Sequence, residues 1–497
     1  MIMVINTLIG KFYATVKEEL KEVYEILSIP YARANRFEKP RKIEKYTDDE
    51  IINRRESICF PQRRIPKFVT KFFKNPLVRP EFMVNDDIQT EDAFVVNIWT
   101  SEFKGKKPVL VFIHGGGDNG SGTVPIYNGS RIASKGIVVV TLNYRFGILG
   151  GLPVYDENGL NANRGALDQQ TALAWIKENI EYFGGDSNNI TLMGQSRGAL
   201  SALNQFLNPM SSKFFDKLIL CAALPVPIIE ADEAERDYKE MLEKNKLPDY
   251  NALKTLPLRK LRRLKIKNIV NEVIDGDFYK ENPRAIFDKG EFSPKPMLIG
   301  ANSDEFTMFY MPIIFNRLGI VKKEENLAAA LLERYGNYGE IMKNALESES
   351  KNLVDLQFKI MEMVAFHTIS YKLLEKFSRT SPVYGYRMSY VPDIFDGIRG
   401  AYHGAELAMF FGNYEKMKIL LTEKNKYEME KLQTDWLSFI RSGTIPNCKY
   451  YNTETKQIIH YKNEPEMISF PHADIVEKVS KLDSYEILFK KFFGVKS

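Results

Sequence analysis

Cysteine and long apolar runs are both scarce in this sequence of 497 residues. Its three cysteines, Cys59, Cys221 and Cys448, are too few for the disulfide framework of a small secreted protein. No window approaches eighteen uninterrupted apolar residues, so we expect no membrane span. The first ten residues lack the basic segment and cleavable apolar core of a secretory signal. These absences together predict a cytoplasmic protein.

An excess of charge of one sign is also missing. The formal net charge is +5 and basic residues are interleaved with acids, so the sequence does not indicate a nucleic-acid partner. The richest basic stretch, residues 259–267, carries leucines at helical spacing, which favours a solvated amphipathic helix over a membrane or RNA patch. No cysteines and histidines cluster with metal-ligand spacing, so we expect no metal and no cofactor.

A candidate nucleophile is present in the motif G-Q-S-R-G, residues 194–198, with Ser196 at its centre. The motif follows an apolar run at 190–193 that is typical of a buried strand, and it precedes a stretch compatible with a helix. A chain that turns this sharply from strand to helix needs glycine at both flanks. The turn would expose the hydroxyl at a helix N-terminus, where free N–H groups can stabilise an oxyanion.

A glycine-rich loop upstream supports this interpretation. The apolar run 109–113 reads as a buried parallel strand and ends in His114-Gly115-Gly116-Gly117. Three glycines let backbone N–H groups approach a ligand closely, as in the second half of an oxyanion hole. An ordinary flexible turn is the alternative, and the later G-x-S-x-G motif argues against it.

A nucleophilic serine needs a base, and the chain offers five histidines: His114, His367, His403, His460 and His472. His114 belongs to the glycine loop, where a role in shaping the turn is favoured. His367 lies in an apolar run typical of a core helix, and His460 lies in a predicted late strand. His403 stands in a loop flanked by glycines after a predicted strand at 383–389, a position from which an imidazole can reach a hydroxyl.

The orienting acid is expected between serine and histidine in the chain. Asp304 and Glu305 both follow a short apolar strand at 296–300, and spacing alone does not choose between them. Asp275 is a weaker alternative, because its D-G-D setting is typical of a turn.

These motifs resemble the type B carboxylesterases, the cholinesterase-like branch of the α/β hydrolases, including bacterial members such as the para-nitrobenzyl esterases. The resemblance covers nearly the whole chain, and its matching segments are residues 29–37, 91–99, 114–117, 143–147, 163–198, 273–277, 299–305 and 401–406. It implies an α/β-hydrolase fold with Glu305 as the acid. It also implies that the oxyanion donors are the N–H groups of Gly116, Gly117 and Arg197.

Three residues depart from the pattern of that family. Arg197 replaces the usual alanine after the nucleophile, and we expect a structural ion pair for its side chain in preference to a substrate contact. Gln195 replaces a glutamate, which removes a negative charge that would attract cationic substrates. Phe306 replaces the glycine that normally follows the acid. The family's early disulfide is not expected, because Ala93 stands where the partner of Cys59 would be.

The organisation of the chain follows from these elements. Residues 5–30 and 90–100 predict an antiparallel edge, and alternating strands and helices from about 108 to 222 predict a mostly parallel sheet with helices on both faces. The candidate site residues run from 114 to 403, so we expect a single domain over residues 1–497. A strong helical pattern covers about 166–182 and ends at Gly184-Gly185, and residues 428–441 predict a late helix. Helical segments at about 230–272 and 310–380 are suited to act as lids.

The predicted activity is two-step acyl transfer by Ser196, His403 and Glu305 on a small-molecule carboxylic ester, without metal or cofactor. An amidase, or a lactone or carbamate hydrolase, on the same three residues is one alternative. A catalytically impaired, cholinesterase-like binding protein is the other. The sequence predicts no oligomeric state.

Overall fold

The computed structural model describes residues 2–16, 20, 22–47, 57–62, 87–116, 119–224, 228–266, 272–309, 321–392, 400–413 and 422–482. They divide into two compact units. The first unit holds the described residues up to 218 together with 228–293. The second holds 219–224 and the described residues from 294 onward.

The first unit begins with antiparallel strands, as the sequence predicts. β1 (Ile2–Asn6), β2 (Lys11–Val16), β3 (Tyr24–Pro30) and β8 (Val95–Thr100) each run antiparallel to the next. All six residues of β8 are buried, because this strand pairs on both sides, with β3 and with β10. The strand thus joins the antiparallel edge to the parallel strands that follow.

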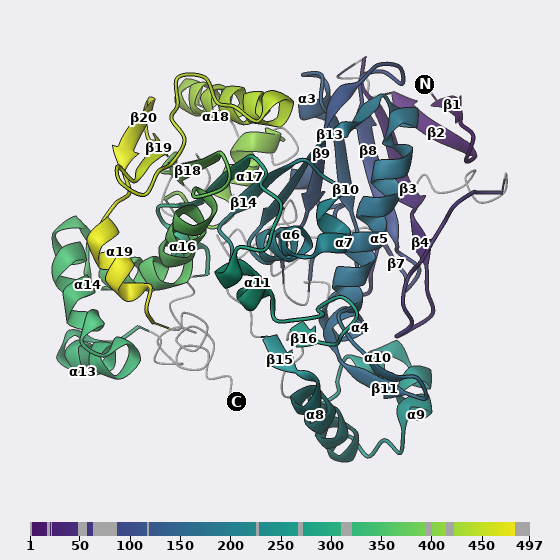
Figure 1. The fold of residues 1–497 in the computed structure, drawn as a ribbon, viewed down its shortest axis with the longest axis horizontal. Coiled ribbons are helices and arrows are strands. Elements are labelled where there is room, and N and C mark those ends of the chain that lie inside the picture. The colour runs from purple at the N-terminus through teal and green to yellow at the C-terminus, as the bar shows by residue number, and fades with distance from the viewer. Residues whose placement is uncertain are drawn as a thin grey trace. The chain divides into compact units, whose positions relative to one another are not determined.

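Three parallel strands carry the candidate loops of the first unit. β10 (Val138–Leu142), β9 (Lys107–Ile113) and β13 (Gly185–Gln195) lie in that order (Figure 1). Val111 stands opposite Val140 on one side and Leu192 on the other. Continuous apolar runs form these strands because both faces of a parallel sheet are covered. Their parallel direction brings the ends of β9 and β13, and so the glycine loop and Ser196, to the same edge of the sheet.

The predicted helix at about 166–182 is present with slightly different ends. α5 (Arg164–Asn179) continues as a 3₁₀ turn, η4 (Ile180–Phe183), and stops at Gly184, whose φ of 79° suits glycine. α5 carries Asp168, which accepts hydrogen bonds from the backbone and the guanidinium of Arg145 at 2.7–2.9 Å. Both side chains are buried, so this ion pair fixes the segment after β10 to α5.

An insertion between β15 (Ile228–Glu230) and β16 (Glu272–Ile274) contains α8 (Ala231–Lys244), α9 (Tyr250–Thr255) and α10 (Leu258–Leu261). The helices predicted for about 230–272 are therefore confirmed over its described residues. α8 and α9 group with β11 (Val154–Asp156) around a small apolar core that includes Tyr238, Leu253 and Leu261 (Figure 1). Leu258 and Leu264 pack against this core while Arg259 and Lys260 are exposed, as expected for an amphipathic segment. The helix predicted over 259–267 is wrong for residues 262–266, because α10 ends at Leu261 and the chain continues in a turn.

The second unit is built on parallel strands with one antiparallel neighbour. β17 (Met297–Asn302), β18 (Val383–Met388) and β19 (Gln457–Tyr461) run parallel, and β20 (Pro465–Ser469) pairs antiparallel with β19. The late helix predicted at 428–441 is α18 (Glu423–Ser442). The β17 and β18 strands are nearly fully buried, and the chain leaves each of them toward a candidate site loop.

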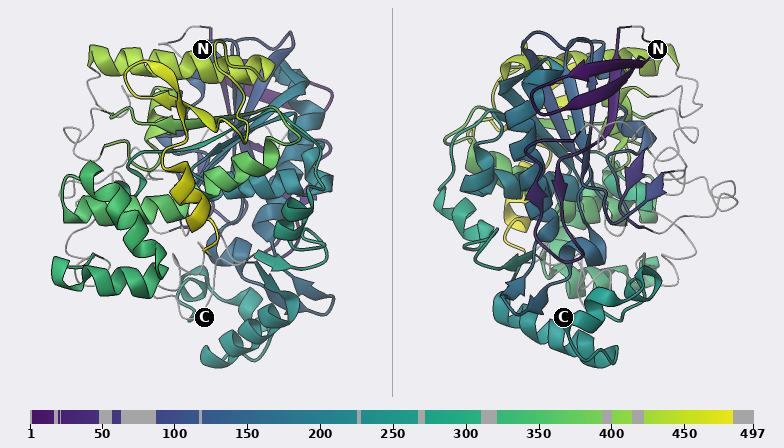
Figure 2. Two further views of the ribbon diagram at one scale, coloured as in Figure 1. Left: turned by 60° about the vertical axis from the view of Figure 1, so that its left-hand side comes forward. Right: turned by 90° about the vertical axis from the view of Figure 1, so that its right-hand side faces the viewer.

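The segment 310–380 is helical over its described part, 321–380, whereas 310–320 lies outside the described residues. α13 (Glu324–Tyr335) packs against α14 (Tyr338–Leu346), the neighbouring green helices of Figure 2. α15 (Leu353–Glu362) and α16 (Thr368–Phe377) are joined without a break by η7 (Met363–His367), a stretch of π-helix.

The remaining elements are short. They are β4 (Ala32–Arg33), β5 (Arg41–Lys42), β6 (Ile58–Cys59), β7 (Ile88–Gln89), η3 (Pro125–Tyr127), α3 (Ser130–Ala133), α4 (Gly147–Gly151), β12 (Gly159–Asn161), α6 (Arg197–Leu207), α7 (Pro209–Ser212), β14 (Lys217–Cys221), α11 (Pro283–Lys289), η5 (Glu305–Phe309), η6 (Glu347–Glu349), α17 (Ala405–Phe411) and α19 (Ala473–Val479). Within the described ranges, no helix has the length and apolar character needed to cross a membrane. All three cysteines are described and none is bonded to another.

Candidate active site

Ser196 occupies a strained turn between β13 and α6. Its φ of 59° and ψ of −125° are unusual for a residue with a side chain. The flanking glycines are required by space, as the sequence predicts. A Cβ on Gly194 would lie 2.1 Å from the carbonyl oxygen of Gly198, and a Cβ on Gly198 would lie 2.2 Å from that of Ile113. The turn therefore forms only with this pattern of glycines.

The glycine loop after β9 lies directly against this turn. A Cβ on Gly115 would lie 2.6 Å from the carbonyl oxygen of Gln195 and 3.2 Å from the Cβ of Ser196. Gly116 has φ of +108°, and a Cβ there would come 2.0 Å from the carbonyl oxygen of Asn119. Backbone groups of the loop can thus approach the serine where side chains could not. Gly117, the second predicted donor of this loop, lies outside the described residues.

His114 shapes this loop, which is the role favoured from the sequence. Its Nδ1 lies 2.9 Å from the carbonyl oxygen of Gly115, and its ring stacks on Tyr144 with centroids 4.5 Å apart. The Tyr144 hydroxyl donates to the His114 carbonyl oxygen at 2.7 Å. Burial lowers the pKa of His114 to about 4, so the imidazole stays neutral at physiological pH.

In the second unit, Glu305 and His403 form a buried pair. The Nδ1 of His403 lies 2.5 Å from Oε2 of Glu305, and Oε1 of Glu305 accepts the backbone N–H of Asn302 at 2.6 Å. Glu305 is fully buried and His403 is 5% exposed. Since a carboxylate only accepts, Nδ1 carries the proton of this bond and Nε2 of the neutral ring is left as the basic nitrogen.

The other two candidate acids have different partners. Asp304 accepts the backbone N–H of Ala401 on its Oδ2 at 3.0 Å, which holds the start of the loop that carries His403. Asp275 accepts the backbone N–H groups of Asp277 and Tyr279 and is a turn residue. Of the two acids that spacing left open, Glu305 is therefore the one that contacts the histidine.

Two more buried carboxyl groups surround this pair, and sequence reasoning missed them. Glu406 accepts a short hydrogen bond from the Asn302 amide, and burial followed by the charge of Glu305 raises its pKa to about 7. Glu362 accepts the backbone N–H of Phe306 at 2.8 Å, and burial raises its pKa well above the usual range. A carboxylate within the apolar run 361–366 was the available signal for Glu362, since such a residue is costly to bury without a partner.

Phe306, which replaces the expected glycine, is held by contacts of both its backbone and its side chain. Its backbone is fixed by Glu362 and its buried ring packs on Phe366, with centroids 5.7 Å apart. Phe366 in turn packs against the imidazole of His403 at 5.2 Å. His367, the next residue, places Nε2 3.3 Å from the carbonyl oxygen of Asn302 and is a half-buried helix residue, in line with the structural role that the sequence predicts.

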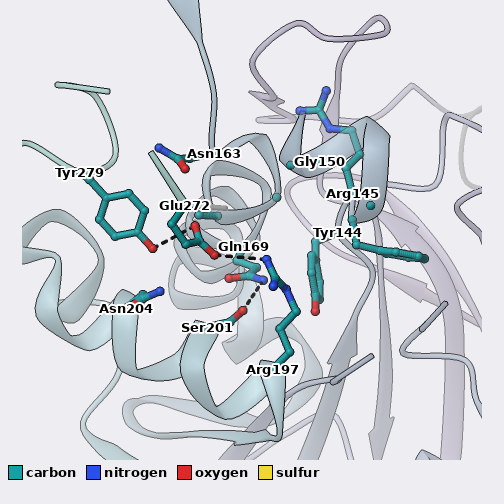
Figure 3. A pocket seen from close by; sticks show the side chains of 15 residues that line it. Tyr144, Arg145, Gly150, Asn163, Gln169, Arg197, Ser201, Asn204, Glu272 and Tyr279 are labelled. Atoms are coloured by element: carbon teal, nitrogen blue, oxygen red, sulfur yellow. Dashed lines mark hydrogen bonds and ion pairs between the residues drawn. The ribbon is translucent and has the colours of Figure 1, made fainter. Parts of the chain in front are cut away.

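Arg197 forms the ion pair predicted for it. Its guanidinium lies 3.4 Å from Glu272, and both side chains point into a polar pocket in the first unit (Figure 3). Of the predicted site residues, Ser196, Gly116 and Arg197 belong to the first unit, and Glu305 and His403 belong to the second.

We compared the chain with protein families and with known proteins that carry the same motifs. The profile of the carboxylesterase family matches residues 4–478. The chain belongs to the carboxylesterase family. Members similar to it include the para-nitrobenzyl esterase of Bacillus subtilis, 28% identical over 96% of this chain and 98% of that protein. The acylcarnitine hydrolase of Rattus norvegicus is 27% identical over 87% of this chain and 81% of that protein.

Solved structures agree with this family membership. A para-nitrobenzyl (PNB) esterase structure superposes with a TM-score of 0.77 and 26% identity, covering 96% of this chain and 99% of the other. This carboxylesterase thus has the predicted α/β-hydrolase fold, and it is a carboxylic ester hydrolase.

Proposed function

We propose that this carboxylesterase is a serine esterase that works through an acyl-enzyme. Ser196 is the nucleophile, His403 is its general base, and Glu305 orients the imidazole and stabilises its charged form. The tetrahedral intermediate is held by three backbone N–H groups, those of Gly116, Gly117 and Arg197.

The buried Glu305–His403 hydrogen bond is the observation that carries this proposal. It is short, 2.5 Å, and it fixes the tautomer in which Nε2 can accept the serine proton. The Ser196 turn adds support, because a backbone held at positive φ by two obligatory glycines is a costly arrangement that is characteristic of functional sites.

The reaction has two similar halves. His403 removes the proton from Ser196 as its oxygen attacks the ester carbonyl, and the protonated ring then gives that proton to the leaving alcohol. Water activated by His403 releases the acid in the second half. Each oxyanion donor is typically worth about 3 kcal/mol in the transition state. Every step uses groups of this chain, and none requires a metal or a cofactor.

The substrate class we propose is a small, uncharged carboxylic ester. Gln195 carries no negative charge next to the nucleophile, so a cationic alcohol group gains no attraction there. We further propose that the helical segments at 230–272 and 310–380 act as lids and that the chain works as a single domain in the cytoplasm.

The test is hydrolysis of p-nitrophenyl esters from acetate to decanoate by the wild-type protein and by Ser196→Ala. Loss of a serine nucleophile should lower turnover on the order of a million-fold. The chain-length optimum of the wild type would give the size of the acyl pocket. Equal activity of the two proteins would refute Ser196 as nucleophile.

A further inference from the structure

The side chain of Arg197 has a role that the activity described above does not explain. Its backbone N–H is a proposed oxyanion donor, while its side chain runs away from that donor to Glu272, 75 residues later in the sequence. The two side chains are only 20% and 13% exposed. A long cation is thus held in one direction beside the nucleophile, where a small residue would suffice for the backbone role.

Glu272 is held from two sides. Its Oε1 lies 3.4 Å from Nη2 of Arg197, and its Oε2 accepts the hydroxyl of Tyr279 at 3.1 Å (Figure 3). Burial raises the pKa of Glu272, and the charge of Arg197 opposes that rise. Both oxygens of the Glu272 carboxylate thus have a defined partner.

The strand that carries Glu272 is anchored independently of Arg197. Val273, the next residue of β16, donates its N–H to Oδ1 of Asn163 at 3.0 Å and accepts from Nδ2 at 2.7 Å. Asn163 precedes α5, so β16 is tied to a main helix of the unit by two buried hydrogen bonds. The fixed end of the ion pair is consequently Glu272, and the end that it holds is the first residue of α6.

A small polar cavity lies beside the ion pair. The ion pair borders a cavity of about 30 Å³, room for one or two waters, lined by polar groups that include Gln169 and Ser201. Gln169 donates to the Ser201 hydroxyl at 3.2 Å, so the other polar groups are partly engaged with each other (Figure 3). The space beside the guanidinium is thus not closed by packed side chains.

We propose that Arg197 is a positioning residue, whose ion pair with Glu272 fixes the peptide between Ser196 and Arg197 and so aims the oxyanion N–H. This inference rests on the proposed function, in which that N–H is a donor. An N–H that is present but poorly aimed stabilises the transition state less, while substrate binding in the ground state is unaffected. The signature is therefore a lower kcat at unchanged KM. We expect about a tenfold loss, below the roughly hundredfold effect of a 1 Å displacement.

The experiment compares Arg197→Met, Glu272→Gln and the double variant on p-nitrophenyl acetate. Glu272→Gln keeps the shape of the side chain and its contact with Tyr279, so it remains informative if the arginine variant folds poorly. The matched control is Arg236→Met, which breaks an exposed ion pair with Asp232 inside the same insertion. We expect kcat to fall about tenfold in each single variant and no further in the double variant. KM and the control should stay within about twofold of wild type.

Chemical rescue adds a second readout. Millimolar guanidinium chloride should leave the kcat of Arg197→Ala low, because an ion beside Glu272 has no covalent link to the Ser196–Arg197 peptide. A restored kcat would overturn the proposal, since it would mean that the charge alone is sufficient. Wild-type kcat in Arg197→Met, a loss in KM instead of kcat, or additive losses in the double variant would overturn the proposal. The proposed function fails differently, through activity retained by Ser196→Ala, so the two failures are distinguishable.

Discussion

Exchanging Glu305 for glutamine tests the acid–base pair most directly. Both carboxylate oxygens face donors, the ring N–H of His403 and the backbone N–H of Asn302. A glutamine offers one acceptor and one NH₂ group, so it can satisfy only one of the two. If the amide oxygen accepts the N–H of Asn302, the NH₂ group faces His403. Nδ1 of His403 must then accept a hydrogen bond, and the ring proton moves to Nε2. The imidazole is then in the wrong tautomer to act as a base.

The expected loss of kcat follows from the other orientation of the amide in Glu305→Gln, in which its oxygen accepts the ring N–H of His403. Turning the amide to serve His403 leaves the buried N–H of Asn302 against a donor, which costs about 1–3 kcal/mol. The charge-assisted bond to the imidazolium is also lost, and bonds to charged groups contribute about 1.5–3 kcal/mol. The two terms together are about 3–6 kcal/mol, which corresponds to roughly 10²–10⁴ in kcat.

The assay is kcat on p-nitrophenyl acetate, with the Ser196→Ala protein as the baseline. Asp304→Asn is the matched control, because its remaining oxygen can still accept the N–H of Ala401. A Glu305→Gln enzyme within about tenfold of wild type would refute the reasoning. So would an Asp304→Asn enzyme with the larger loss.

Two further results are expected, both on stability. Asp168→Asn breaks the buried ion pair with Arg145 and should lower the free energy of unfolding by about 3–5 kcal/mol in a urea titration, and a change below about 1 kcal/mol would contradict this. The second concerns His114, whose pKa of about 4 in the folded protein lies below the value near 6.5 in the unfolded chain. The contribution of the neutral ring to stability is therefore complete above about pH 6.5 and is lost as the pH falls toward 4. Between about pH 7 and pH 5 the wild type should lose ~2 kcal/mol more than His114→Gln in the same titration, and parallel pH curves would argue against a buried neutral ring.

The features that the sequence predicted well are those set by local sterics and patterning. The Ser196 turn follows from two glycines and an apolar run, all within about ten residues, and α5 follows from its periodicity and from Gly184. His403 could be selected among five histidines because its loop is flanked by glycines after a predicted strand, whereas His114, His367 and His460 lie in segments with structural roles. Each of these inferences needed only the neighbours along the chain.

The features that the sequence left open depend on contacts between distant segments. Asp304 and Glu305 share one loop, and the choice between them depends on the path of a loop about a hundred residues later. The partner of Arg197 lies 75 residues away in a strand of three residues, too short to be predicted with its register. The buried position of Glu406 depends on the Asn302 amide, which no periodicity indicates.

The π-helical stretch Met363–His367 has a consequence for how this region can vary. It lies between Glu362, which holds the Phe306 backbone, and α16, which packs against β17 and β18. A substitution there changes one side chain, but a deletion that restored regular α-helix would turn everything after it by about 100°. The face of α16 that covers these strands would then point elsewhere. We therefore expect natural variation in this segment to proceed by exchange of residues at constant length.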